Sequence, residues 1–166
     1  MRWLRSHVGP AMVLVPAVTA LIRDAEGRIL LMRRSDDGRW DLPGGAIDPG
    51  EAPAQALVRE VWEETGLFVV PERIAGLFGG RPGFRSTYPN GDEVEYTDLV
   101  FLCRVAGGSL TSHDGEATDF RWVPPAEMPA LPFRYPADFF TSLDDAPRAR
   151  FEWKDEWLRE CVKRKT

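Results

Sequence analysis

Residues 45–67 read GAIDPGEAPAQALVREVWEETGL, and the middle of this stretch predicts an amphipathic helix over residues 53–65. Pro53 favours the first turn of that helix, because the N–H group that proline lacks would have no partner there. Gly66 is typical of the residue that ends a helix in the left-handed conformation. Apolar residues recur between these positions at the spacing of one helix face. We predict that this face packs on the core: Ala54, Leu57, Val58, Val61 and Trp62.

Three glutamates lie on the opposite face of the same helix. Glu60, Glu63 and Glu64 are spaced i, i+3 and i+4, so their side chains project in one direction. Like charges at this spacing destabilise a helix, and acids in its last turn oppose the helix dipole. Arg59 is the only Lys or Arg between residues 51 and 67. One interpretation is a solvated acidic face. The other, which we favour, is a site for a hard divalent cation, because such cations prefer oxygen ligands.

The fixed residues of this stretch resemble the Nudix box, G-x5-E-x7-R-E-U-x-E-E-x-G-U, in which U is aliphatic. Gly45, Glu51 and the run from Arg59 to Leu67 match every fixed position. The flanking sequences LPGG (42–45) and WVPPAEMP (122–129) are also typical of Nudix hydrolases. The resemblance spans roughly residues 1–140, an ordinary domain size. It implies an α/β (α+β) fold, a Nudix-type α/β/α sandwich around a mixed β-sheet, and we expect residues 1–166 to form a single Nudix hydrolase domain.

The resemblance also implies a metal site. Glu60 and Glu64 would be the principal ligands of Mg²⁺ or Mn²⁺, and Glu63 would be a further ligand or act through metal-bound water. The backbone carbonyl of Gly45 would complete the set of oxygen ligands. Glycine at this position would let the backbone come close to the metal.

The implied reaction is hydrolysis of a nucleoside diphosphate linked to another moiety, with an ADP-ribose-like compound or a nucleoside triphosphate as substrate. Glu60, Glu63 and Glu64 would be catalytic through the metal. Glu63 is the first candidate for the general base, and Glu116, in a predicted loop, is the second. Glu51 and Arg59 would form an ion pair that orients the box.

Two features favour different substrates. Pro82, fifteen residues after Leu67, resembles a proline of the ADP-ribose pyrophosphatase subset, although it also fits an ordinary loop. The sequence RYPAD (134–138) resembles the base-contacting segment of MutT-related triphosphatases. In that interpretation Tyr135 stacks on a nucleobase and Asp138 accepts a hydrogen bond from the edge of the base. The other interpretation is that Tyr135 packs at the rim of the core.

Two arginines are candidates for binding phosphate. Arg39 and Arg81 flank the predicted metal site, and a guanidinium pairs well with phosphate oxygens. They are equally consistent with ordinary surface arginines. A rival function for the whole chain is a non-catalytic Nudix-fold nucleotide-binding or sensor module. The intact box favours the enzyme.

The composition narrows the class of partner. The chain has 166 residues, with 26 acidic and 21 basic side chains and a net charge of −5, which argues against a nucleic-acid partner. No apolar run reaches the ~18 residues needed to span a membrane. The N-terminus lacks the apolar core of a signal peptide. Two cysteines are too few for a disulfide framework. We therefore expect a cytoplasmic protein that acts on a small nucleotide diphosphate derivative, with no membrane contact.

The remaining elements follow from hydrophobic patterning. We expect strands at 12–22, 28–34, 39–42, 67–70, 74–80, 94–105 and 119–123. Residues 81–92 read as a loop, with a short helix near 125–128 and one helical turn at 139–143. A terminal helix is expected at about 151–162. Trp3, Trp153 and Trp157 lie near the two termini, where they would pack on the sheet or form a homodimer interface.

Overall fold

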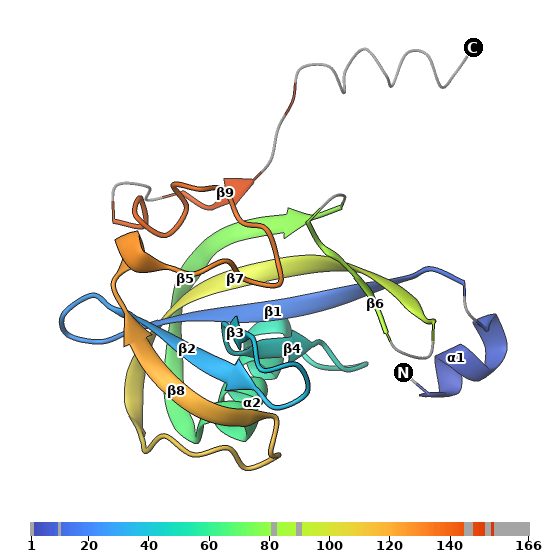
Figure 1. The fold of residues 1–166 in the computed structure, drawn as a ribbon, viewed down its shortest axis with the longest axis horizontal. Helices are drawn as coiled ribbons and strands as arrows, with labels where there is room; N and C mark the ends of the chain where they lie inside the picture. Colours follow the sequence, from blue (N-terminus) through green and yellow to red (C-terminus); the bar gives the residue numbers. More distant parts are fainter. Residues whose placement is uncertain are drawn as a thin grey trace.

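The computed structural model describes residues 2–9, 11–80, 83–88, 91–144, 148–151 and 154. Most of these residues belong to one mixed sheet and the helix α2 (Figure 1). The strands are β1 (Val13–Arg23), β2 (Ile29–Arg34), β3 (Trp40–Asp41), β4 (Gly44–Ala46), β5 (Leu67–Gly79), β6 (Arg85–Thr87), β7 (Glu93–Gly108), β8 (Ala117–Val123) and β9 (Arg150–Phe151). The helices are α1 (Arg2–Val8), α2 (Pro53–Thr65) and the 3₁₀-helix η1 (Pro125–Glu127).

The sheet has parallel and antiparallel pairs. Its main strand order is β3-β2-β1-β7-β5-β9, while β4 pairs with β1, β6 with β7 and β8 with β2. The long strands β1 and β7 run parallel, from Val13 opposite Val94 to Arg23 opposite Arg104. β5 runs antiparallel to β7 over its whole length. The predicted mixed sheet and α/β (α+β) class are therefore confirmed.

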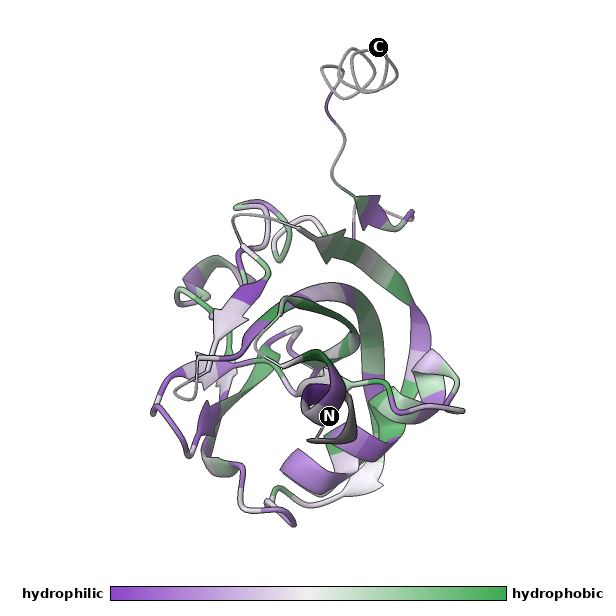
Figure 2. Cartoon of the chain, turned by 90° about the vertical axis from the view of Figure 1, so that its right-hand side faces the viewer, coloured by the Kyte–Doolittle hydropathy of each residue, from purple (hydrophilic) through white to green (hydrophobic). Residues whose placement is uncertain are grey.

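Two hydrophobic clusters lie on the two faces of β1, as the period-2 alternation of a strand requires. Val18, Ala20 and Ile22 face α2, where they pack with Leu57 and Val61. On the other face Leu21 packs with an aromatic group. That group contains Phe78, Phe84 and Phe139. Hydrophobic residues run along the curved strands that enclose these clusters (Figure 2).

Several boundaries differ from the sequence prediction. β5 is continuous through Pro71, where two strands were expected, because the register shifts between Pro71 and Arg73 accommodate the proline. The strands β4 and β6 and the helix α1 were not predicted. They are short, and short elements carry little periodic signal. Phe151 lies in β9, not in the predicted terminal helix, the rest of which falls almost wholly outside the described residues. Within the described part of the chain, no helix is long and apolar enough to cross a membrane.

Candidate functional site

The helix α2 occupies the predicted residues but turns a slightly different face to the core. It starts at Pro53 and ends at Thr65. The next residue, Gly66, has a φ of 68° and donates its backbone N–H to the carbonyl of Trp62 at 2.9 Å. The predicted stripe was wrong at its edges, since Ala54 and Trp62 are exposed. The ring of Trp62 stacks on the His113 ring instead, with the centroids 4.4 Å apart. The face that does pack inward comprises Ala56, Leu57, Val61, Glu64 and Thr65.

Glu64 is the unexpected member of this buried face. Its side chain is only 3% exposed, and its Oε2 accepts a hydrogen bond from the backbone N–H of Gly44 at 2.7 Å. Burial raises the pKa of Glu64 well above its usual range, and the negative charges of Glu60, Glu116 and Asp114 raise it further. The ionised form of Glu64 is therefore unfavourable unless a positive charge binds beside it.

The carboxyl group of Glu60 lies against the backbone of Gly45. A β-carbon at position 45 would lie 2.5 Å from the Cδ of Glu60, so any other residue would displace this carboxylate. Burial raises the pKa of Glu60, although hydrogen bonding to Arg59 acts in the opposite direction. The two glutamates thus converge on the Gly44–Gly45 backbone.

Arg59 connects the carboxylates of the helix. Its Nε and Nη2 donate to the two carboxylate oxygens of Glu51, each at 2.8 Å, so the predicted ion pair is present. Its Nη1 also donates to Glu60 at 2.8 Å and to Glu63 at 3.2 Å. The guanidinium holds the pKa of Glu51 at about 2. Arg59 therefore orients three acids, whereas the sequence indicated only one.

Glu116 is brought to the same place by the connection from β7 to β8. The backbone N–H of His113 donates to the carbonyl of Glu63 at 2.7 Å, which ties this connection to the end of α2. The Oδ1 of Asp114 accepts the backbone N–H of Glu116 at 2.9 Å. Glu116 is exposed, and its charge acts on both Glu60 and Glu64. The structure thus brings together all four predicted catalytic glutamates.

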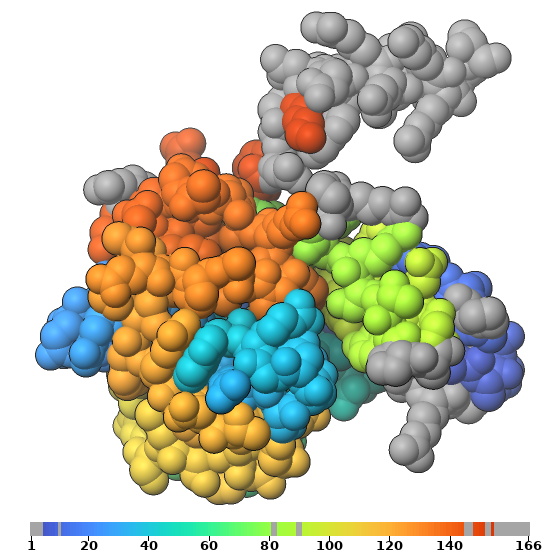
Figure 3. Space-filling view, in the orientation of Figure 1, coloured from blue at the N-terminus to red at the C-terminus, as the bar shows by residue number. Residues whose placement is uncertain are grey.

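A pocket of about 560 Å³ opens beside these acids. Gly45, Glu64 and Glu116 form part of its wall. In the space-filling view, the cyan segment around residue 40 lies between the orange segment near residue 130 and the light green residues near 85 (Figure 3). All three segments contribute to the lining. Its volume is within the usual range for small-molecule sites.

Aromatic side chains form another part of the pocket wall. Tyr88 and Tyr96 line it, and their hydroxyl oxygens are 2.7 Å apart. Phe133 also lines the pocket, with its ring centroid 5.2 Å from that of Tyr96. The sequence did not identify these residues, because they come from a hairpin and a loop that only the tertiary fold brings together.

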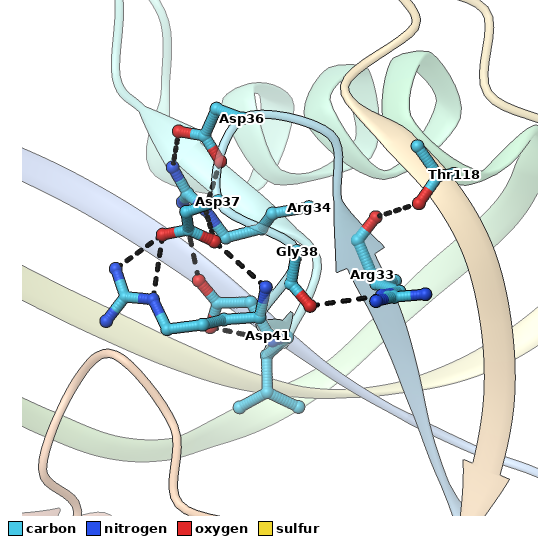
Figure 4. A network of polar contacts seen from close by, with 9 residues as sticks. Arg33, Arg34, Asp36, Asp37, Gly38, Asp41 and Thr118 are labelled. Carbon is cyan, nitrogen blue, oxygen red and sulfur yellow. Dashed lines mark hydrogen bonds and ion pairs between the residues drawn. The ribbon is translucent and has the colours of Figure 1, made fainter.

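Arg34, and not Arg39, is the arginine in the described lining. Its Nη2 lies 2.6 Å from Asp36 and its Nη1 lies 3.5 Å from Asp41 (Figure 4). Arg39 is exposed and pairs with Asp37 at 2.6 Å. Burial raises the pKa of Asp41 to about 6. The alternation of β2 could have identified Arg34, since Met32, two residues earlier, also lines the pocket.

The other predicted substrate contacts lie elsewhere. Tyr135 donates its hydroxyl hydrogen to Asp98 at 2.8 Å, and its ring packs in the aromatic cluster with Phe139. Asp138 is exposed and pairs with Arg150 at 3.1 Å. Neither Tyr135 nor Asp138 belongs to the pocket wall, because their side chains are engaged in the core and at β9. Arg81 and Pro82 lie outside the described residues.

The chain matches the NUDIX domain family over residues 13–145. It belongs to that family. It is 33% identical over 112 residues to a MutT-like protein of Streptomyces ambofaciens, which is 68% of this chain and 65% of that protein. It is 31% identical over 142 residues to an RNA pyrophosphohydrolase of Novosphingobium aromaticivorans, which is 72% of this chain and 84% of that protein. The match to the first relative thus leaves about a third of that protein's length uncovered.

The solved structure of a MutT protein from Methanosarcina mazei Go1 has the same fold. It superposes with a TM-score of 0.61 at 34% identity, covering 80% of this chain and 94% of that one. The family match includes the predicted Nudix box and the residues of the pocket wall, but begins after α1. The helix α1 therefore lies outside the region matched to the family.

The donors of this Nudix site suit a hard divalent cation. Glu60 and Glu64 offer carboxylate oxygens beside the backbone of Gly45, and no histidine or cysteine of the described residues lines the pocket. Arg59 at present holds Glu60 and Glu63, so no group of three or more acids, histidines or cysteines among the described residues is already arranged around one point. A cation bound by the carboxylates of Glu60 and Glu64 would supply the positive charge that stabilises the ionised form of Glu64.

Proposed function

We propose that this protein is a Mg²⁺- or Mn²⁺-dependent pyrophosphohydrolase that cleaves the phosphoanhydride bond of a nucleoside diphosphate linked to another moiety. The observation that carries the proposal is the pair of half-buried Glu60 and buried Glu64, packed on the Gly44–Gly45 backbone, with Glu64 and both glycines in the wall of the pocket. Stability alone does not account for two acids with raised pKa values in such a place.

Glu60, Glu64 and the carbonyl of Gly45 would hold the cation, with Glu63 as a further ligand. A bound divalent cation offsets the charge of the diphosphate and lowers the pKa of a bound water. Arg59 keeps the carboxylates of Glu60 and Glu63 in position, because it is itself fixed by two hydrogen bonds to Glu51. On binding, the cation would compete with Arg59 for the carboxylates of Glu60 and Glu63.

Glu63 and Glu116 are the candidates for the general base. Glu63 is hydrogen-bonded to Arg59 and does not belong to the pocket wall. Glu116 belongs to the wall, is exposed and comes from a separate loop. The geometry favours Glu116, which could accept the proton of the attacking water without giving up an ion pair.

A nucleoside suits the rest of the pocket. The rings of Tyr88, Tyr96 and Phe133 offer apolar surface on which a nucleobase can pack. Arg34 is already paired with Asp36 and Asp41, so this part of the wall favours an uncharged group over a phosphate. The diphosphate would then lie toward Glu64 and Glu116.

The same chemistry admits two kinds of substrate. One is a free nucleotide such as an ADP-ribose-like compound or a nucleoside triphosphate. The other is the 5′-terminal phosphates of an RNA, which the name of the Novosphingobium relative suggests. The net charge of −5 favours the free nucleotide, because an extended RNA needs basic surface for its backbone.

The cellular location and the oligomeric state of the enzyme are also proposals. We place it in the cytoplasm and infer a homodimer, since the outer face of β5 exposes several large apolar side chains. These are Phe68, Val70, Ile74 and Leu77.

A substrate panel tests the proposed function. The protein is incubated with ADP-ribose, a dinucleoside polyphosphate, 8-oxo-dGTP and a 5′-triphosphorylated RNA, each with Mg²⁺ or with EDTA. We expect Mg²⁺-dependent release of a nucleoside monophosphate from at least one of the small compounds, or of pyrophosphate from the RNA. Tight binding without turnover would support the rival sensor module, and neither binding nor turnover would contradict both.

A further inference from the structure

The hairpin that joins β6 to β7 carries Tyr88 to the pocket. The backbone N–H of Tyr88 donates to the carbonyl of Asp92 at 2.9 Å, and that of Gly91 donates to the carbonyl of Tyr88 at 2.9 Å. The hydroxyl oxygens of Tyr88 and Tyr96 lie 2.7 Å apart. The position of this hairpin therefore decides where one aromatic part of the pocket wall stands.

The β6 arm of the hairpin has little support from the sheet. Among the described residues β6 pairs with β7 alone, over the three pairs that run from Arg85 opposite Glu95 to Thr87 opposite Glu93. β7 also pairs with β1 here, with Val13 opposite Val94, so β6 is a three-residue edge strand with a partner on one side. A contact from outside the hairpin can therefore have a large effect on its position.

Arg5 of α1 makes such a contact. Its Nη2 donates to the carbonyl of Glu93 at 2.8 Å, and its Nε lies 3.2 Å from the Oδ2 of Asp92. Its Nη1 donates to the carbonyls of Ala11 at 2.7 Å and Gly9 at 3.2 Å. The side chain is only 12% exposed. One guanidinium thus joins α1, the start of β1 and the hairpin turn.

This contact lies far along the chain from the Nudix box. Figure 1 shows α1 beside the ends of β6 and β7, on the opposite side of the fold from β8 and the β1–β2 turn. Arg5 does not belong to the pocket wall, whereas Tyr88, next to the turn that it holds, does. Charge-assisted hydrogen bonds are stronger than neutral ones, and the partial burial of this group limits screening by solvent.

We propose that Arg5 is a positioning residue that sets the affinity for the nucleoside part of the substrate by fixing the β6–β7 hairpin. This inference rests on the proposed function. Arg5 touches neither the box nor the predicted metal ligands, so it acts on substrate binding and leaves the chemical step unchanged. The helix α1, outside the region that matches the family, becomes part of the substrate site.

The test compares Arg5→Ala with a matched control, Arg28→Ala. Arg28 also pairs with acids, Asp24 and Glu26, but in the β1–β2 turn away from the pocket. Hydrogen exchange is measured first, because it does not depend on activity. We expect the amides of residues 93–96 to exchange about tenfold faster in Arg5→Ala and at the wild-type rate in Arg28→Ala. Unchanged protection of these amides in Arg5→Ala would show that Arg5 does not hold the hairpin.

Kinetics with the best substrate of the panel complete the test. We expect KM to rise about fivefold to tenfold in Arg5→Ala while kcat stays within about twofold, which is the pattern for lost ground-state binding. Arg5→Lys, which keeps the charge, should recover part of the affinity. Tyr88→Phe should raise KM as well, and the double variant should be less impaired than the product of the two effects.

Each failure has a distinct meaning. Faster exchange with an unchanged KM would overturn the role in affinity, although the hairpin contact would stand. A fall in kcat at constant KM would mean that Arg5 acts on the chemical step, and this would also overturn the inference.

If no compound of the panel is hydrolysed, the proposed function fails. The dissociation constant of ADP, measured by calorimetry, then replaces KM, and the absence of any difference between Arg5→Ala and the wild type overturns this inference separately.

Discussion

Glu64 is an acidic side chain in a position that would suit an apolar one. It lies on the inner face of α2, and the backbone N–H of Gly44 donates a hydrogen bond to it. Burial raises its pKa, so the folded protein favours the neutral form of this group. The stability that this neutral form provides is complete below the usual pKa of glutamate, 4.5, and is lost as the pH rises through the raised value.

Glu64→Gln should therefore stabilise the metal-free protein at neutral pH. Glutamine keeps an oxygen for the Gly44 N–H and removes the buried charge, so we expect Tm at pH 7.5 to rise by about 2–4 °C. Near pH 4 the difference should disappear, because Glu64 of the wild type is then neutral. Differential scanning calorimetry in EDTA at both pH values measures this.

Mg²⁺ should make the wild type more stable to heat than Glu64→Gln, the reverse of their order in EDTA. A ligand that binds only the folded state, at a concentration of 100 times its dissociation constant, adds about 2.7 kcal/mol to the free energy of unfolding. The wild type should gain Tm on addition of Mg²⁺, and Glu64→Gln should gain much less. Glu72→Gln, a change of the exposed glutamate beside Arg104, is the control and should behave as the wild type in both conditions. A lower Tm for Glu64→Gln in EDTA, or an equal gain with Mg²⁺, would argue against this interpretation.

At the scale of the element, α2 shows what local sequence determines and what it leaves open. Pro53 and Gly66 gave both ends of the helix correctly, because proline and glycine act through the backbone of their own position. The direction in which the helix faces was predicted wrongly at the edges. The apolar pattern predicted a stripe through Ala54 and Trp62, whereas packing against β1 and β5 turns Glu64 inward.

Gly66→Ala should destabilise the protein through this helix end. The β-carbon of an alanine there would lie 2.6 Å from the carbonyl oxygen of Ser109, which is a steric clash. The alanine would also have to adopt a φ of 68°, which strains its backbone. We expect a loss of about 2–4 kcal/mol in the free energy of unfolding, measured with urea. Gly50→Ala separates the two causes. Gly50 also has a positive φ, 92°, but its β-carbon would meet no atom within 4 Å, so the loss should be about 1 kcal/mol. Equal losses would mean that the collision contributes nothing.

At the scale of the whole molecule, the sequence predicted the class of the fold and the acids of the site. The box residues lie within one stretch of chain, and Glu60, Glu63 and Glu64 share one helix, so short-range periodicity was enough to group them. The parallel pairing of β1 with β7 and the sheet order were not predictable, because they depend on contacts between strands far apart in sequence.

The substrate part of the site was predicted less well for the same reason. Tyr135, for which we considered both a nucleobase contact and packing at the rim of the core, packs in the core with its hydroxyl on Asp98. Phe133 lines the pocket instead. Tyr88 and Tyr96 meet only because β6 folds back on β7. A motif indicates which chemistry a chain can perform, whereas the shape of a pocket depends on how loops meet.

The measurement that tests the account most directly is the Mg²⁺-dependent kcat of Glu60→Gln on the best substrate of the panel. Its carboxylate packs on Gly45 and is not needed for the Arg59–Glu51 pair, so the fold should survive the change, as circular dichroism would show. We predict a fall in kcat of at least about 100-fold, while the exposed control Glu72→Gln keeps wild-type turnover. Wild-type turnover by a folded Glu60→Gln protein would contradict the assignment of this helix face as the catalytic metal site.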